Sequence, residues 1–307
     1  NTGGELNAST TFDKTFFYET VPSNQLSLVL WLESDRMNSL EVNEAKVARI
    51  KELMLANEQE RNLQEPYARY FFLMDQILFP DFSYGHSPLG TKESINSITV
   101  GDVLAFYHRY YVPNNAVICI SGDIKAQKAR ELVTKYFETI PRGAEAPLYP
   151  EADFSSVISS RDQTIVDPMV STPALEFGLR LDNPLPAERP LIRLFEYLLI
   201  NGKSSRLYKL LVSRERTALY LSGNLEARRG FISLKIFLLA NNQIMINRSK
   251  KMISDELNKF KLELVSEREL LKAKNKYRYD FLSQLTTTNL ARALTLSEFY
   301  FDRGQLP

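Results

Sequence analysis

The sequence predicts an α+β protein of two related domains, each a mixed sheet packed by long helices. At roughly 150 residues per domain, 307 residues are enough for two separate cores. Both halves also combine strand patterns with long amphipathic helix patterns. Between them, residues 141–164 are rich in Pro, Ser, Ala and Glu without periodicity, as in a linker. We therefore expect domains at 1–145 and 160–307, although no short sequence repeat relates them.

The first half begins with a strand and continues mainly with helices. Residues 16–22 are aromatic and β-branched before a Pro, which is typical of a strand. A buried helix is expected after Asn24, a residue type that caps helix N-termini. The helices expected in this half cover residues 24–37, 42–62, 66–77, 99–111 and 125–138, with a Pro/Gly-rich loop at 79–93.

Two local signals in the first half are more specific. Thr99 and Asp102 have the spacing of a capping box, which predicts a helix that begins here and ends before Pro113. Residues 116–121 are almost continuously apolar and precede Gly122, which predicts a strand buried on both faces.

The second half contains a strand, a hairpin and four helices in the predicted pattern. The hairpin joins residues 217–227 to 230–239 through a turn at Arg228, Arg229 and Gly230. Ser266 and Glu269 form a second expected capping box, which begins a helix that continues past Tyr277. The remaining elements are a strand at 173–181 and helices at 187–201, 204–215 and 242–264.

Composition excludes several function classes. Lys and Arg number 38 against 37 Asp and Glu, so the net charge of +1 is too small for a protein that neutralises nucleic-acid phosphates. No apolar run approaches the ~20 residues that a membrane-spanning helix needs. Cys119 is the single cysteine and His86 and His108 are the two histidines, so a closed Cys/His zinc site cannot be built from this chain. Phosphate-binding P-loop and G-x-S-x-G patterns are absent as well.

A long motif in residues 3–37 indicates a family. It contains Gly4-x-x-Asn7-Ala8-x-Thr10, then Asp13-x-Thr15, then a strand and a helix that ends in Asp35-Arg36-Met37. This order resembles the insulinase-like (pitrilysin) zinc metallopeptidases. Further matching pieces follow in the family's order: Asn57-Glu58, Pro66-Tyr67, Tyr84-Gly85-His86, Leu89-Gly90, Tyr111-x-Pro113-Asn114-Asn115, Gly122-Asp123 and Gly202-x-Ser204-Ser205-Arg206-Leu207-Tyr208.

The resemblance implies zinc as cofactor. Family enzymes hold zinc with two histidines of an inverted His-x-x-Glu-His on a helix and a Glu from a later helix, and the zinc activates a water. Glu58 matches the later Glu, although a solvated charge on a Glu/Lys-rich helix is the alternative. The His-x-x-Glu-His is not in this sequence and would precede Asn1, so we expect the first domain to lack its first elements and the second to be truncated at its C-terminus. We assign no catalytic residue and expect this chain alone to be inactive.

The resemblance also implies substrate-binding residues. Asn7, Ala8 and Ser9 match an edge strand beside the zinc, where an extended peptide can pair by strand addition; an ordinary edge strand is the alternative. Tyr220 matches a Tyr that contacts substrate. Two positions depart from the family pattern: Lys51 replaces a commonly acidic residue, although Glu52 is adjacent, and Ser213 replaces an Arg, although Arg214 and Arg216 are nearby.

We therefore expect part of a zinc metalloendopeptidase that cleaves extended peptides in a chamber formed with a second homologous half or subunit. The departures at Lys51 and Ser213 favour the alternative, a non-catalytic partner or substrate-binding subunit of the same fold. The resemblance to bacterial members points to a periplasmic or secreted setting.

Overall fold

The computed structural model describes residues 3–64, 67, 70, 72–80, 82–145, 160–167 and 169–303, without the side chains of 58–64 and 302–303. Its contacts divide the chain into two compact units, each made of discontinuous segments. Unit 1 comprises Asn1–Glu58, Pro88–Pro150 and Phe281–Pro307, and unit 2 comprises Gln59–Ser87 and Glu151–Asp280. The domain boundaries expected from the sequence, 1–145 and 160–307, stay predictions. The structural similarity expected between the two domains also stays a prediction. Residues 146–159 of the expected linker lie outside the described residues.

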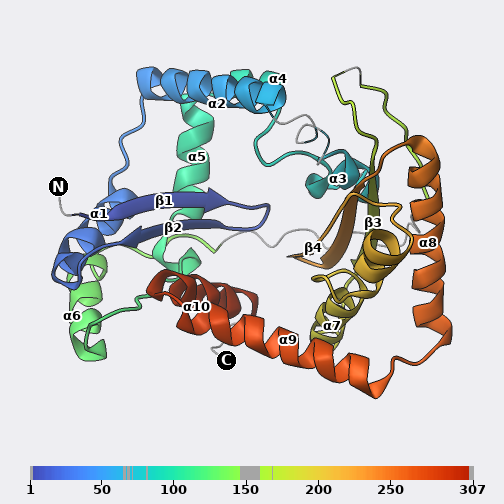
Figure 1. Ribbon diagram of the computed structural model, residues 1–307. Helices are drawn as coiled ribbons and strands as arrows, with labels where there is room; N and C mark the ends of the chain where they lie inside the picture. The colour runs from blue at the N-terminus through green and yellow to red at the C-terminus, as the bar shows by residue number, and fades with distance from the viewer. Residues whose placement is uncertain are drawn as a thin grey trace. The chain divides into compact units, whose positions relative to one another are not determined.

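Unit 1 contains a two-stranded antiparallel hairpin and several helices (Figure 1). Strands β1 and β2 pair with Ala8 opposite Phe17. The capping box at Thr99 and Asp102 is confirmed, because each residue's side chain accepts the backbone N–H of the other. The elements are β1 Glu5–Thr10, β2 Thr15–Thr20, α1 Leu26–Asn38, α2 Glu44–Gln64, α4 Lys92–Ser97, α5 Val100–Tyr110, α6 Ala126–Phe137 and α10 Asn289–Arg303; the boundary between the units falls within α2.

The strand expected at residues 116–121 is wrong. This segment has no strand conformation, and Val117 and Ile118 are 42% and 44% exposed instead of buried. An apolar, β-branched run has the composition of a buried strand, but a strand forms only beside a neighbour that shares its hydrogen bonds. Within the described residues no strand pairs with this segment.

Unit 2 is built on a three-stranded antiparallel sheet in the order β3-β5-β4. The predicted hairpin is confirmed, with Gly230 at φ +79°, a left-handed conformation that favours glycine in a tight turn. Within the helix expected at 204–215, residues 208–214 form a π-helix, and much of the helix expected at 66–77 lies outside the described residues. The elements are α3 Leu73–Leu78, β3 Ala174–Asp182, α7 Arg189–Leu199, β4 Tyr220–Arg228, β5 Phe231–Leu239, α8 Gln243–Leu262 and α9 Glu267–Thr286, whose last residues belong to unit 1.

The two faces of this sheet differ in chemistry. One face packs with α7, α8 and the π-helix into the hydrophobic core, where Leu199, Leu211, Ile236 and Ile253 are fully buried. The opposite face carries polar side chains and is approached by α3: a Cβ added at Gly178 would lie 2.4 Å from the Met74 sulfur. The sheet is therefore apolar toward its core and charged toward α3. The α+β class is confirmed, and both described sheets are antiparallel rather than mixed.

Candidate functional site

The edge of strand β1 is open to an additional strand. All six residues of β1 are exposed, and within the described residues β1 pairs only with β2. The hairpin loop closes with a hydrogen bond from the Thr11 N–H to the Lys14 carbonyl, 2.8 Å long. Because hydrogen-bonded and non-hydrogen-bonded pairs alternate along an antiparallel ladder, Ala8 and Phe17 form a non-hydrogen-bonded pair. The backbone groups of Leu6, Ala8 and Thr10 therefore face away from β2.

The three residues assigned to substrate binding on β1 have different roles in this geometry. The Ala8 N–H donates to the Asn7 side-chain oxygen at 2.8 Å, which confirms that it points to the open edge. Asn7 and Ser9 lie opposite Tyr18 and Phe16, in pairs whose backbone groups face β2. Ala8 thus directs its N–H to the open edge of β1, where the Asn7 side chain accepts it.

Tyr220, the fourth residue assigned to substrate binding, is the first residue of β4 in unit 2. Its side chain is 51% exposed, and its ring meets the Phe237 ring edge to face at 6.2 Å. Ser213 lies in the π-helix, and the neighbouring Arg214 binds Glu215 at the surface. Tyr220 is therefore exposed to solvent and contacts an aromatic neighbour on one side.

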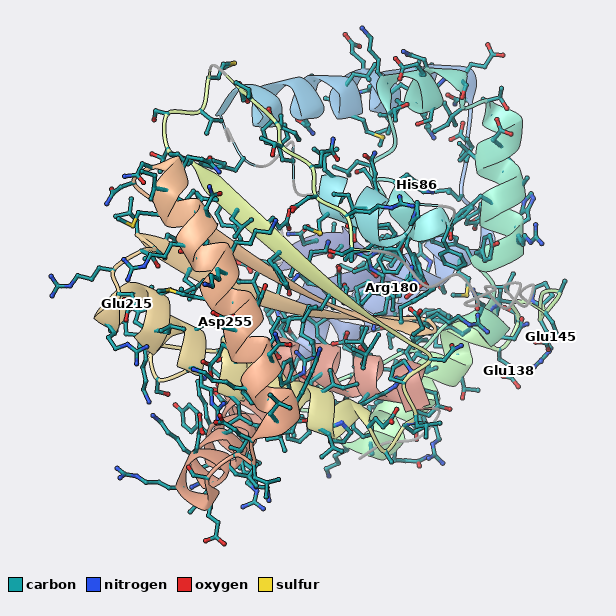
Figure 2. The ribbon with its side chains drawn as sticks, turned by 90° about the vertical axis from the view of Figure 1, so that its right-hand side faces the viewer. His86, Glu138, Glu145, Arg180, Glu215 and Asp255 are labelled. Atoms are coloured by element: carbon teal, nitrogen blue, oxygen red, sulfur yellow. The ribbon has the colours of Figure 1, made fainter. Side chains whose placement is uncertain are left out.

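The described residues do not build a zinc site. Glu58 falls within α2, but its side chain is outside the described part of the structure. No group of three or more His, Cys, Asp or Glu side chains that could hold a metal occurs among the described residues. His86 lies in an exposed loop of unit 2 (Figure 2), and His108 lies on α5 in unit 1. The donors among the described residues do not fit a closed zinc site.

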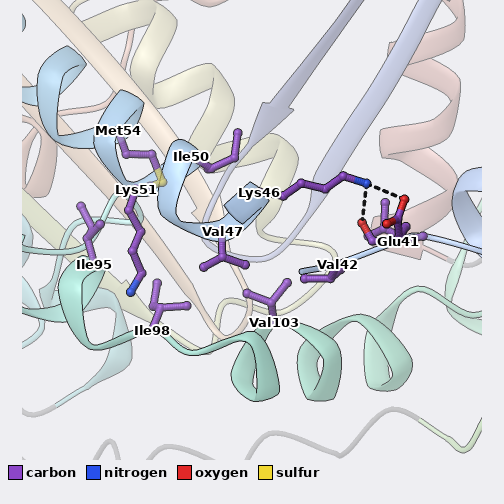
Figure 3. Close-up of a pocket in the computed structure, with 11 residues that line it drawn as sticks. Glu41, Val42, Lys46, Val47, Ile50, Lys51, Met54, Ile95, Ile98 and Val103 are labelled. Carbon is purple, nitrogen blue, oxygen red and sulfur yellow. Dashed lines mark hydrogen bonds and ion pairs between the residues drawn. The ribbon is translucent and has the colours of Figure 1, made fainter. Parts of the chain in front are cut away.

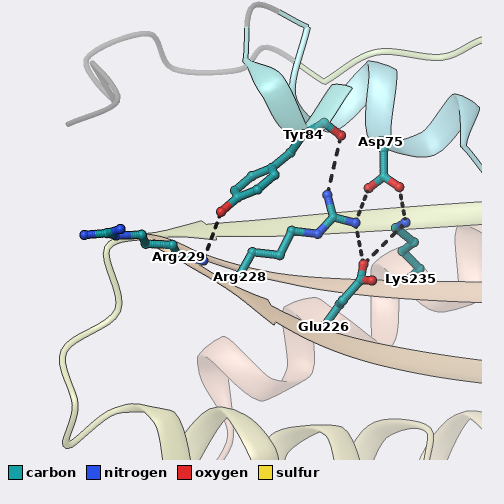
Figure 4. Close-up of polar contacts among 6 residues, drawn as sticks. All are labelled: Asp75, Tyr84, Glu226, Arg228, Arg229 and Lys235. Carbon is teal, nitrogen blue, oxygen red and sulfur yellow. Dashed lines mark hydrogen bonds and ion pairs between the residues drawn. The ribbon is translucent and has the colours of Figure 1, made fainter. Parts of the chain in front are cut away.

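A buried ionic cluster on the polar sheet face was not expected from the sequence (Figure 4). Arg228 on β4 and Lys235 on β5 both bind Asp75 of α3, at 2.9 and 2.8 Å, and Arg228 also contacts Glu226 at 2.5 Å. Asp75 and Arg228 are almost completely buried. The predicted turn had placed Arg228 outside the strand, whereas it is the last residue of β4. The cluster fixes α3 to the sheet.

Glu176 is a second residue that sequence reasoning missed. It lies on β3, on the same face as the cluster, and is half-buried. Burial raises the pKa of Glu176 to about 7, and Asp75 adds to this increase while Lys235 opposes it. The signal in the sequence was the alternation of β3, which places Glu176, Arg180 and Asp182 on one face.

An apolar groove lies in unit 1 beside α2 (Figure 3). It has a volume of about 350 Å³. At its rim Lys46 binds Glu41 at 2.9 Å, and the Lys51 ammonium donates to the Asn96 carbonyl at 2.8 Å. The groove can accept apolar side chains but offers few polar groups for chemistry. It is lined by Leu40, Glu41, Val42, Lys46, Val47, Ile50, Lys51, Met54, Ile95, Ile98 and Val103.

Comparison with known proteins identifies the family. A family model described as the peptidase M16 inactive domain matches residues 97–277, more than half of the chain. The chain belongs to the M16 peptidase family. The resemblance to insulinase-like peptidases found in the sequence is thereby confirmed.

M16 relatives also share the fold over nearly the whole chain. The zinc protease PqqE of Helicobacter pylori is 26% identical over 290 residues, which cover 94% of this chain and 65% of that protein. A crystal structure of a protease from Helicobacter pylori aligns with a TM-score of 0.84 at 23% identity, over 99% of this chain and 73% of the other. The periplasmic protease PqqL of Escherichia coli aligns with a TM-score of 0.69 at 18% identity, over 98% of this chain and 34% of PqqL.

The chain covers only part of the length of its M16 relatives. The chain spans about two thirds of PqqE, and the matched family model describes an inactive domain. Relatives are named zinc proteases, so hydrolase and metalloprotease chemistry belongs to the family. No described helix has the length and hydropathy that crossing a membrane requires.

Proposed function

We propose that this chain is the peptide-holding part of an M16 zinc endopeptidase, in which the edge of β1 binds extended substrate by strand addition. The orientation of the Ala8 N–H, away from β2 and toward the open edge, carries this proposal. Backbone pairing of this kind gives affinity with little dependence on sequence. Ala8 pairs with the peptide through its backbone, and Asn7 and Ser9 contribute side chains at β1. Tyr220, on unit 2, is a separate proposed substrate contact.

We propose zinc-dependent hydrolysis for the complete protein and not for this chain alone. Relatives named zinc proteases support zinc as the family's cofactor, and Glu58 remains our proposed ligand from this chain. In the complete gene product, Glu58→Gln should lower the bound zinc per protein as well as turnover of a quenched peptide. Unchanged zinc content would remove Glu58 from the ligand set.

The test of strand addition is Ala8→Pro in the complete gene product. Proline removes the N–H at the open edge and leaves the β1–β2 hydrogen bonds, because this N–H is not shared with β2. Loss of one backbone hydrogen bond should weaken binding of an extended peptide about tenfold. Ala8→Val, which keeps the N–H and favours a strand, is the matched control. Equal affinity of the two variants would contradict strand addition at β1.

A non-catalytic partner or substrate-binding subunit is the second candidate. The description of the matched family model as an inactive domain, together with Lys51 and Ser213 at departing positions, favours it. The two candidates separate when the complete gene product is purified and assayed for zinc and for chelator-sensitive hydrolysis. Zinc at about one ion per protein with chelator-sensitive turnover supports the enzyme; peptide binding without turnover supports the subunit.

A homologous half or subunit is the partner we propose. Solved relatives include the first half of PqqL, so a two-half arrangement occurs in the family. Trp31, Leu53 and Phe106 are large apolar side chains exposed on unit 1, as on a surface that another protein covers. Light scattering of the complete gene product would show whether it holds one such half or two. Because PqqL is periplasmic, we also propose a periplasmic or secreted setting, which cell fractionation tests.

A further inference from the structure

Three side chains lie in one row on the polar face of the unit 2 sheet. Glu176 on β3 lies directly opposite Phe237 on β5, and Phe237 lies opposite Ser222 on β4. Side chains on one face of such a row are close enough to act together. Glu176 is half-buried, yet it makes no hydrogen bond or ion pair in the described part of the structure. When ionised, a half-buried carboxylate without a partner is stabilised by a nearby cation.

Phe237, which lies opposite Glu176, contacts two further aromatic rings. The Phe237 ring meets the Tyr67 ring at 5.7 Å and the Tyr220 ring at 6.2 Å, both at steep angles. The Tyr67 hydroxyl donates to the Thr172 carbonyl at 2.7 Å, which fixes one side of this group. Of these three aromatic residues, Tyr220 is exposed to solvent. The faces of such rings attract cations within about 6 Å of the centroid.

The charges that surround Glu176 do not satisfy it. Lys235 is held by Asp75 at 2.8 Å and lies 3.7 Å from Glu226, and Arg228 is held by the same two carboxylates. Farther along the face, Arg180 binds Asp182 at 2.7 Å, so these two charges cancel. With Glu176 ionised, Asp75, Glu226 and Glu176 face two cations, Arg228 and Lys235, and one negative charge is left over.

We propose that Glu176, Phe237 and Tyr220 form a subsite for a basic side chain, Lys or Arg, of an extended peptide. The inference rests on the proposed function, since it names the kind of side chain that the peptide-holding chain prefers. The cation balances Glu176 and lies against the aromatic rings, while the methylene stem of Lys or Arg covers Phe237. Tyr220, assigned to substrate contact by family resemblance, then forms the entrance of this subsite.

The test compares two peptides on the complete gene product. Both are extended ten-residue peptides of the same sequence, with either Lys or norleucine at the central position, so that they differ only in the ammonium group. Wild-type protein should bind the Lys peptide at least about fivefold more tightly, and Glu176→Gln should abolish this preference. Asp255→Asn removes an exposed carboxylate from α8 (Figure 2), whose helix packs on the other side of the sheet, and should keep the preference.

Raising the pH sharpens the same measurement. Because the pKa of Glu176 is raised to about 7, most of this group is protonated at pH 6 and ionised at pH 8. The affinity for the Lys peptide should therefore increase about three- to tenfold between pH 6 and pH 8, while the norleucine peptide shows no such increase. Glu176→Gln should remove the pH dependence of the preference.

A third measurement separates this subsite from the proposed function. The carboxyl carbon of Glu176 is followed by NMR during titration with N-acetyl-lysine methylamide, which offers the side chain without an extended peptide. If both peptides bind equally and Ala8→Pro weakens both, the subsite is wrong and the proposed function stands. If neither peptide binds but the lysine amide lowers the titration midpoint of Glu176, the proposed function is wrong and the subsite stands. If neither peptide binds and the amide has no effect, both are wrong.

Discussion

The two units bury their apolar residues to very different extents. In unit 2, the β3-β5-β4 sheet has one face packed by α7 and α8, and a contiguous hydrophobic cluster of the described residues lies there. In unit 1, every residue of β1 is exposed, and large apolar side chains such as Trp31, Phe106 and Ile118 remain open to solvent. Unit 2 is stabilised by this core, whereas in unit 1 few described apolar side chains, among them Leu30, Ile95 and Tyr107, are buried. The exposed apolar side chains of unit 1 are the reason for the proposal that a partner covers it.

The buried ionic cluster should give the largest effect. Asp75→Ala leaves Arg228 and Lys235 without their common carboxylate in a nearly dry environment, and should lower the free energy of unfolding of unit 2 by about 3–5 kcal/mol. Urea titration with hydrogen-exchange mass spectrometry would assign the loss to unit 2. Glu41→Ala, which breaks the exposed ion pair with Lys46 in unit 1, is the control and should leave the midpoint unchanged. Similar losses for both variants would contradict the difference in burial.

A matched pair of isoleucines tests the core directly. Ile236 in β5 is fully buried, whereas Ile118 in the apolar run of unit 1 is 44% exposed. Ile236→Ala should cost about 3 kcal/mol, through lost burial and the cavity left behind, and Ile118→Ala less than about 1 kcal/mol. If a homologous half or subunit covers unit 1, the cost of Ile118→Ala should increase when that partner is present. A constant small cost with the partner bound would show that this surface is not part of the interface.

In the described part of each unit, one half-buried carboxyl has a pKa raised to about 7. Burial raises the pKa of Glu176 to about 7, and burial together with Glu33 does the same for Glu19 in unit 1. A folded-state pKa above the unfolded value means that the folded state binds the proton more tightly, so the stability gained is complete below about pH 4 and is lost as the pH rises through 7. The free energy of unfolding should therefore decrease between pH 5 and pH 8.

Single substitutions can assign this pH dependence of stability to one unit or the other. Glu176→Gln should flatten the pH dependence of hydrogen exchange in unit 2 only, and Glu19→Gln that in unit 1 only. Glu269, whose pKa is lowered by its hydrogen bonds with Arg206, has the opposite sign, because its contribution is lost as the pH falls. Stability that rises steadily from pH 5 to pH 8 in the Glu269→Gln variant would contradict the assignment to the buried carboxyls.

The sequence predicted what local chemistry determines. The capping box at Thr99 and the hairpin before Gly230 were found because their signals lie within a few residues. The strand at 116–121 was wrong because its apolar composition says nothing about whether a partner strand is present. The contact of Asp75 with Arg228 joins residues 153 apart, and neither residue signals the other in the sequence. Asn7, Ala8 and Ser9 came from a family motif, but only the ladder register showed which backbone faces the open edge.

Removing a helix N-cap should give the smallest loss of stability of these substitutions. It tests whether the helices of the two units are equally well formed. Thr99 caps α5 in unit 1 by accepting the Asp102 N–H at 3.2 Å, and Asn242 caps α8 in unit 2 by accepting the Met245 N–H at 3.0 Å. Replacing either residue by Ala should cost about 1 kcal/mol, because an N-cap acts within one helical turn and does not depend on a distant core. Equal costs for Thr99→Ala and Asn242→Ala, measured by hydrogen exchange in each helix, would show that the helices of the two units are equally well formed. The difference between the units would then lie in side-chain burial alone, which is the property that a bound partner can change.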